Sequence, residues 1–217
     1  MLEFIIFDLD ETLYPRADGL MIEVGRRIQD WLQRRFSLTP EEAVAMRRYH
    51  YTHYGTTLSG LIVEHHLAPA EVHDYLRFVH DVRVTEYVSP NPALAAMLDS
   101  IPLRKAVYTN ATVEYARRVL RALGVADRFE RLIGIEEVGL LSKVYREAYE
   151  RALERLGAPG RACVMVEDTP VNLRSAKSVG MTTVLVGKEP VPEADFVVAR
   201  VLDVADVVRP LIRKRAD

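Results

Sequence analysis

The sequence predicts an α/β fold with three layers, in which a doubly wound parallel sheet carries an inserted group of helices. The stretch from about residue 3 to residue 9, EFIIFDL, is continuously apolar, as expected for a strand covered on both faces. Beyond about residue 104, short apolar segments alternate with helical segments of about 10 to 15 residues, the pattern of βαβ units. Between these two regions the chain shows helical spacing and no convincing strand.

Each expected element rests on a local pattern. The inserted helices are predicted from the segments GLMIEVGRRIQDWLQRRF, PEEAVAMRRYHYTHYG and PAEVHDYLRFVHDV, and a short helix from VSPNPALAAMLDSI. The later strands are predicted from RKAVYTN, FERLIGI, RACVMVED, TTVLVG and DFVVA. The later helices are predicted from TVEYARRVLRALG, KVYREAYERALERLG, PVNLRSAKSVG and VLDVADVVRPLIRK. We therefore expect a Rossmann-like core of residues 1–15 and 85–217 and an all-helical cap of residues 16–84.

The composition excludes several classes of protein. The 217 residues are 49% hydrophobic and 28% charged, which suits one globular core with a modest insertion. A formal net charge of -2 provides no field that would gather nucleic acid or an anionic membrane surface. The single cysteine, Cys163, cannot form an internal disulfide, and no signal peptide or membrane span is evident. We expect a cytoplasmic protein that acts on a small molecule, with no nucleic acid or membrane partner.

Polar residues are predicted to gather at the carboxyl edge of the sheet, where ligands bind in doubly wound folds. They are Asp8 and Asp10 after the first strand, Thr109 and Asn110 after the second, Glu167 and Asp168 at the end of a later one, and Lys143 before a helix. Four carboxylates at close quarters repel unless a cation or a shared proton relieves them. Oxygen ligands of this kind suit Mg²⁺, which binds substrate phosphate as well. The residue types therefore indicate phosphoryl transfer.

Four segments, in this order, resemble the motifs of the haloacid dehalogenase superfamily of phosphohydrolases. They are DLDET, VYTNAT, the SK that precedes a helix, and VEDTPVNLRSAKSVGM. The helical insertion after the first motif resembles the family's first cap type, called C1. One departure is Val144, because many relatives have proline directly after the motif lysine. The resemblance implies a Mg²⁺-dependent phosphatase that works through an aspartyl-phosphate.

The resemblance also implies roles for the first two acids. Asp8 would be the nucleophile and a metal ligand. Asp10 would protonate the leaving alcohol, then activate water, and would offer the metal its backbone carbonyl.

The remaining motif residues would bind phosphate and metal. Thr109 and the Asn110 N–H would hold phosphoryl oxygens, and Lys143 would neutralise negative charge. Asp168 is the expected side-chain metal ligand. Glu167 is expected either to bind the metal directly or to support the residues that bind it.

The cap segment YHYTHYGTTLSGL resembles the pyrimidine 5′-nucleotidase branch of the superfamily, in which a Tyr-Gly loop precedes a Leu-x-Gly-Leu helix. This resemblance implies nucleoside 5′-monophosphates such as UMP and CMP as substrates, with Tyr54 contacting them. A sugar phosphate, phosphoglycolate or pyridoxal phosphate is the alternative substrate. Six histidines fall between residues 50 and 80, but their spacing does not predict a zinc site.

Three other functions compete with the phosphatase. A phosphorylatable receiver module would place its aspartate after a middle strand, whereas the paired acids here follow the first. A dehalogenase would not need the second acid, Asp10. A catalytically retired phosphate-binding protein is the third alternative, and the complete motif set disfavours it.

Overall fold

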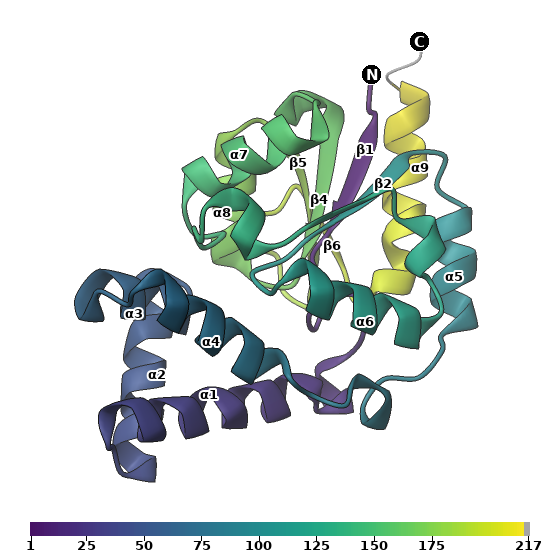
Figure 1. Cartoon of the computed structure of the whole chain (residues 1–217). Helices are drawn as coiled ribbons and strands as arrows, with labels where there is room; N and C mark the ends of the chain where they lie inside the picture. Colours follow the sequence, from purple (N-terminus) through teal and green to yellow (C-terminus); the bar gives the residue numbers. More distant parts are fainter. Residues whose placement is uncertain (215–217) are drawn as a thin grey trace.

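The computed structural model describes residues 1–214 and contains a parallel sheet of six strands in the order β3-β2-β1-β4-β5-β6 (Figure 1). The strands are β1 (Phe4–Phe7), β2 (Arg104–Tyr108), β3 (Arg131–Ile133), β4 (Cys163–Glu167), β5 (Thr182–Val186) and β6 (Phe196–Val198). The helices are α1 (Leu20–Phe36), α2 (Pro40–Tyr54), α3 (Thr57–His65), α4 (Pro69–His80), α5 (Pro92–Asp99), α6 (Val113–Leu123), α7 (Arg146–Leu156), α8 (Pro170–Ser178) and α9 (Val204–Lys214). Residues 215–217, the end of the predicted core range, lie outside the described part.

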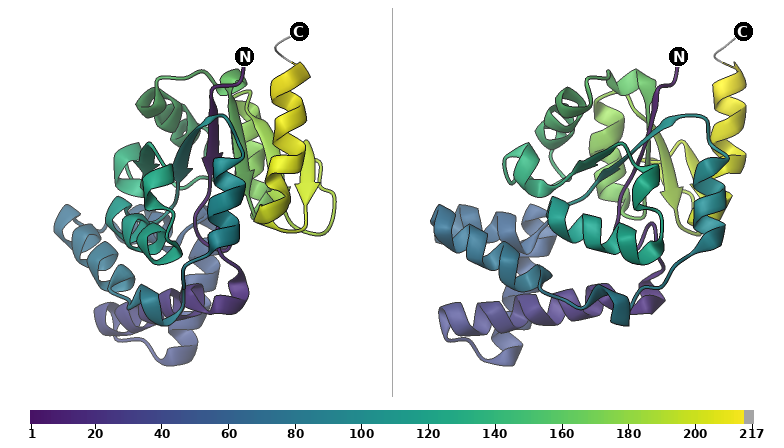
Figure 2. Two further views of the ribbon diagram at one scale, coloured as in Figure 1. Left: turned by 90° about the vertical axis from the view of Figure 1, so that its right-hand side faces the viewer. Right: turned by 45° about the vertical axis from the view of Figure 1, so that its right-hand side comes forward.

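Helices cover both faces of the sheet (Figures 1 and 2). Ile5 and Phe7 of β1 share one hydrophobic cluster with α5, α6 and α9, whereas Phe4 and Ile6 share another with α7 and α8. Successive side chains of a strand point to opposite faces, so a strand between two helical layers must be apolar at every position. This explains why the first strand reads as an unbroken apolar run.

The inserted helices α1 to α4 have a hydrophobic cluster of their own. Trp31 of α1 packs edge-on against Tyr75 of α4, with ring centroids 5.1 Å apart. Ile135, from the loop that follows β3, belongs to the same cluster and joins it to the sheet. The strands run with their carboxyl ends toward these helices (Figure 1), so the insertion lies beside the edge where the candidate site is expected.

The predicted fold class, a parallel sheet with inserted helices, is confirmed. The division at residues 15/16 and 84/85 stays a prediction. One boundary differs: α7 begins at Arg146, so Lys143 and Val144 lie in a turn before the helix and not in its first turn. None of the helices between residues 1 and 214 combines the length and the apolarity that crossing a bilayer requires.

Candidate active site

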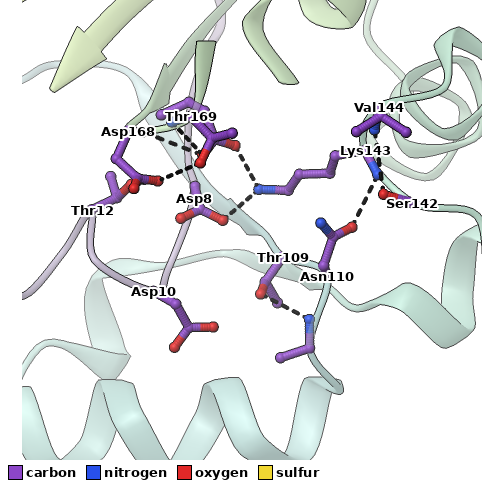
Figure 3. A network of polar contacts seen from close by, with 12 residues as sticks. Asp8, Asp10, Thr12, Thr109, Asn110, Ser142, Lys143, Val144, Asp168 and Thr169 are labelled. Atoms are coloured by element: carbon purple, nitrogen blue, oxygen red, sulfur yellow. Dashed lines mark hydrogen bonds and ion pairs between the residues drawn. The ribbon is translucent and has the colours of Figure 1, made fainter. Parts of the chain in front are cut away.

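Three neighbouring strands bring the predicted residues together. Asp8 directly follows β1, Thr109 follows β2 and Glu167 ends β4, and both outer strands pair with β1. The Asp8 N–H donates to the Val166 carbonyl at 2.9 Å, which continues the β1–β4 ladder by one residue. The parallel register therefore places side chains more than 150 residues apart in sequence at one edge of the sheet (Figure 3).

Lys143 is the central cation of this edge. Its side chain is fully buried, and its Nζ forms ion pairs with Asp8 Oδ1 and, at 3.0 Å, with Glu167 Oε2. The Lys143 backbone N–H donates to Asn110 Oδ1 at 3.0 Å, which fixes the turn that carries it. A buried ammonium is tolerated only when paired, and here two carboxylates satisfy it.

Glu167 uses both of its oxygens within the protein. Oε2 accepts from Lys143, and Oε1 accepts from the backbone N–H groups of Asp168 and Thr169, each at 3.2 Å. Asp168 Oδ1 lies 3.4 Å from the Thr12 hydroxyl and 3.3 Å from the Thr169 hydroxyl. Glu167 thus ties the lysine to the loop that presents Asp168.

The carboxyl pKa values at this edge lie above their ordinary range. Burial raises the pKa of Asp8 to about 6, with the charge of Glu167 adding to the rise and Lys143 opposing it. Burial likewise raises the pKa of Glu167 to about 7, although the Lys143 charge pulls it down. Burial would lower the pKa of Lys143, but the charges of Asp8 and Glu167 outweigh it and raise that pKa. The positive charge that the protein supplies at this edge therefore does not fully balance the negative charge of these acids.

A divalent cation fits the donor set. One carboxylate oxygen from each of Asp8, Glu167 and Asp168 lies within 4.8 Å of the others. Three ionised carboxylates against the single ammonium of Lys143 leave two negative charges, which one divalent ion balances. All the donors are oxygens, the ligands that Mg²⁺ prefers. The Asp10 side chain is not part of this group.

The carboxyl of Asp10 is held elsewhere. Its Oδ1 accepts hydrogen bonds from Tyr14 Oη at 2.5 Å and from Tyr115 Oη at 3.0 Å. Burial raises the pKa of Asp10 to about 7, the Asp8 charge adds to the rise, and both tyrosine hydroxyls oppose it. Sequence reasoning missed the two tyrosines. Tyr14 lies only four residues after Asp10, and this nearness in sequence was the one weak sign that the two could meet. Tyr115 comes from α6, and nothing in the sequence linked it to Asp10.

Thr109 and Asn110 line the end of β2. The buried Thr109 hydroxyl accepts from the Ala111 N–H at 3.0 Å, which shapes the turn after the strand. The side-chain oxygen of Asn110 accepts the hydrogen bond from the Lys143 backbone N–H. Both residues therefore lie at the same edge as Asp8, as Figure 3 shows.

The end of α2 approaches the lysine turn. Gly55 has φ +75°, and a Cβ there would lie 2.4 Å from Val144 Cγ1 and 2.5 Å from Ser142 Oγ. Tyr54, a predicted substrate contact, donates its hydroxyl to Glu64 at 2.6 Å. Tyr51, one turn earlier, was not singled out from the sequence. Its side chain is 58% exposed, and desolvation followed by the charge of Asp168 raises its pKa.

A second group of possible metal ligands lies in the inserted helices, where His50, Glu64 and His65 offer atoms within 4.8 Å of one another. Glu64 Oε1 already accepts from Tyr49 at 3.0 Å and from Tyr54, and Glu64 Oε2 lies 3.4 Å from His50 Nε2. Contacts between α2 and α3 therefore explain this clustering without an ion, and we assign none to it.

Comparison with known families matches most of the chain to a single family. A family model described as haloacid dehalogenase-like hydrolase matches residues 2–180. The match spans β1 to the end of α8, so it includes every residue of the cluster around Lys143.

Individual relatives are distant. Phosphate metabolism protein 8 of Saccharomyces cerevisiae is 25% identical over 82% of this chain, and the match spans 60% of the yeast protein's length. A glyceraldehyde 3-phosphate phosphatase of Methanocaldococcus jannaschii is 26% identical, and the match covers 97% of this chain and 99% of that protein. The solved structure of a HAD phosphatase from Thermococcus onnurineus superimposes with a TM-score of 0.65 at 20% identity, covering 95% of this chain and 98% of that one. This last likeness establishes the fold.

Proposed function

The chain belongs to the haloacid dehalogenase-like hydrolases, and from this membership and the site we propose that it is a phosphatase of small phosphate monoesters that works through a phosphorylated Asp8. The observation that carries the proposal is the difference between the two acids after β1. Asp8 forms an ion pair with a buried lysine. The carboxyl of Asp10, two residues later, instead accepts hydrogen bonds from two tyrosine hydroxyl groups. Two acids in such different environments suit a nucleophile and a proton donor.

The two acids divide the reaction between them. An Asp8 oxygen attacks phosphorus, the bond from phosphorus to the ester oxygen breaks, and Asp10 gives its proton to the departing alkoxide. A water molecule then transfers a proton to Asp10 and attacks the phosphorus of the aspartyl-phosphate, which releases inorganic phosphate and restores both carboxyl groups to their starting states.

The surrounding residues balance the negative charge of the site and position the phosphate group. Lys143 keeps Asp8 ionised and faces the incoming phosphate, and Thr109 with the Asn110 N–H receives phosphoryl oxygens. A Mg²⁺ ion held by Asp8, Asp168 and the Asp10 backbone carbonyl would supply the positive charge that the cluster lacks.

In this proposal Glu167 does not bind the metal itself but supports the residues around it. Both of its oxygens already accept hydrogen bonds, one from Lys143 and the other from two backbone N–H groups. We therefore assign it the role of positioning Lys143 and the loop of Asp168.

The inserted helices are proposed as the cap that covers the substrate. Gly55 lets the end of α2 approach the turn of Lys143, and the exposed Tyr51 lies one turn earlier on the same helix. The resemblance of residues 49–61 to the pyrimidine nucleotidase branch favours nucleoside 5′-monophosphates as substrates. Tyr54 would then have to leave Glu64 or bind through its ring. The archaeal relative instead favours a three-carbon phosphate such as glyceraldehyde 3-phosphate.

The chemistry is tested by Mg²⁺-dependent release of phosphate from p-nitrophenyl phosphate. Wild-type protein should be active and Asp8→Asn inert, while the exposed acid variant Asp127→Asn keeps wild-type activity. An active Asp8→Asn would reject the nucleophile. An inactive wild type, with Mg²⁺ present, would favour the phosphate-binding or receiver alternatives.

The substrate is tested by a panel at equal concentration: UMP, CMP, glyceraldehyde 3-phosphate, phosphoglycolate, a hexose phosphate and pyridoxal phosphate. The nucleotidase assignment requires the highest kcat/KM with UMP or CMP. A preference for glyceraldehyde 3-phosphate would move the chain toward the specificity of its archaeal relative.

A further inference from the structure

We propose that Tyr14 and Tyr115 are positioning residues for Asp10, and that their hydroxyl groups together set the orientation of its carboxyl toward the leaving group. This inference rests on the proposed function, because Asp10 has a leaving group to protonate only if the chain cleaves phosphate esters. Neither tyrosine lies within the segments that resemble the family's motifs.

The first support is the geometry at Asp10. Both phenols donate to the same oxygen, Oδ1, at 2.5 Å and 3.0 Å. Whenever Asp10 is ionised, these are hydrogen bonds to a charged acceptor, which are among the stronger ones in proteins. The two donors approach from different elements, since Tyr14 belongs to the loop after β1 and Tyr115 to the first turn of α6. Two fixed donors on one oxygen restrict rotation of the carboxyl and leave Oδ2 as the oxygen that the phenols do not occupy.

The second support is the rigidity of the two tyrosines. Tyr14 is 2% exposed and Tyr115 is 1% exposed, and both belong to the large cluster between the sheet and α5, α6 and α9. A side chain packed on all sides holds its hydroxyl in place at little further cost in entropy. The carboxyl of Asp10 is thereby held by two side chains that are themselves fixed in the packed core.

The third support is the link from Tyr115 to the inserted helices. The ring of His80, the last residue of α4, packs against the ring of Tyr115 with centroids 4.7 Å apart and an angle of 34° between the ring planes. Arg118, one turn further along α6, donates to the carbonyls of His80 and, at 2.9 Å, of Val82. The segment through which the chain returns from the insertion to the sheet is thus fastened beside the residue that holds Asp10.

The position of Asp10 explains why such anchoring matters. In Figure 3 its carboxyl is turned away from the Asp8–Lys143 ion pair, so a donor must keep it from joining that cluster. A proton donor contributes only when it lies within hydrogen-bond reach of the leaving oxygen, and an error of about 1 Å lowers the rate strongly. We infer that the tyrosines keep Asp10 apart from the cation side of the site and aimed at the ester oxygen.

The test uses Tyr14→Phe, Tyr115→Phe and the double variant, each of which removes one oxygen atom and keeps the ring. Tyr149→Phe is the matched control, because Tyr149 is fully buried and its hydroxyl has no hydrogen-bond partner in the described part of the chain. The value of kcat/KM is measured with p-nitrophenyl phosphate, whose leaving group needs little protonation, and with an alkyl phosphate such as glycerol phosphate, whose leaving group needs it. This quantity reports only steps up to the departure of the alcohol.

The expected result is a loss that depends on the leaving group. General acid catalysis contributes about 10²- to 10⁴-fold, so misplacing Asp10 should lower kcat/KM for the alkyl phosphate by about 10-fold or more and for p-nitrophenyl phosphate by less than about 3-fold. In an Asp10→Asn background, Tyr115→Phe should have no further effect, because the group that it positions is gone. Tyr149→Phe should match the wild type with both substrates.

An equal loss with both substrates, or a full loss that persists in the Asp10→Asn background, would overturn the proposal in favour of a purely structural role. A crystal structure of the Tyr14→Phe/Tyr115→Phe variant gives a readout that is independent of activity, and an unmoved Asp10 carboxyl there would also overturn it. Failure of the proposed function has a different signature, namely wild-type protein that releases no phosphate, or an active Asp8→Asn.

Discussion

The replacement Glu167→Gln should change how the stability of the metal-free protein depends on pH. The carboxyl of Glu167 is 1% exposed, and burial raises its pKa from 4.5 to about 7. Glutamine has nearly the same shape, and its Oε1 can still accept from the Asp168 and Thr169 N–H groups. The variant therefore removes a titrating proton while keeping most of the packing.

The sign of the effect follows from proton binding. A carboxyl whose pKa is raised in the folded state binds a proton there at pH values where the unfolded chain has already lost it. Its stabilising contribution is complete below about pH 4.5 and is lost as the pH rises through about 7. From pH 5 to pH 8 this loss amounts to roughly 2 to 3 kcal/mol, since each pKa unit corresponds to about 1.4 kcal/mol.

The assay is urea unfolding in EDTA at pH 5, 6, 7 and 8. The free energy of unfolding of the wild type minus that of Glu167→Gln should fall by roughly 2 to 3 kcal/mol across this range. Glu136→Gln serves as the control, because Glu136 also accepts a backbone N–H, from Val113 at 2.9 Å, but is exposed. A wild-type minus Glu167→Gln difference that stays constant from pH 5 to pH 8 would refute the reasoning.

The remaining predictions concern metal, backbone and thiol. Mg²⁺ should raise the melting temperature at pH 8, and isothermal titration should detect no binding to Asp8→Asn/Asp168→Asn, since that variant removes two of the three clustered carboxylates. Gly55→Ala should lower the free energy of unfolding in urea by about 2 to 3 kcal/mol, because φ is positive there and the added Cβ would meet Val144. Cys163 is fully buried, and burial raises its pKa to about 12, so a thiol reagent should modify it only at the rate of unfolding; rapid modification in native buffer would contradict this burial.

The sequence predicted the fold class because that class depends on patterns that each segment carries alone. An apolar run such as FIIF is typical of a strand covered on both faces, and helices between successive strands favour parallel pairing. The same topology predicted that Asp8, Thr109 and Glu167 would approach one another, since parallel strands end at one edge.

Sequence alone left other features of the site open because they depend on the direction in which a side chain turns. Which donors the Glu167 oxygens accept from depends on the 168–169 backbone and on Lys143, which follows no strand. Lys143 was correctly placed before a helix, but the sequence did not determine that α7 begins only at Arg146.

The types and order of the reactive residues could thus be predicted from the sequence, since strand ends and motif spacing are local properties. The partners of those residues were decided by the tertiary structure. Tyr115 reaches Asp10 across 105 positions of sequence, and it does so because α6 packs on the face of the sheet beside the loop after β1. A hydrogen bond of that kind exists only once the helix, the sheet and the return segment from the inserted helices are packed together.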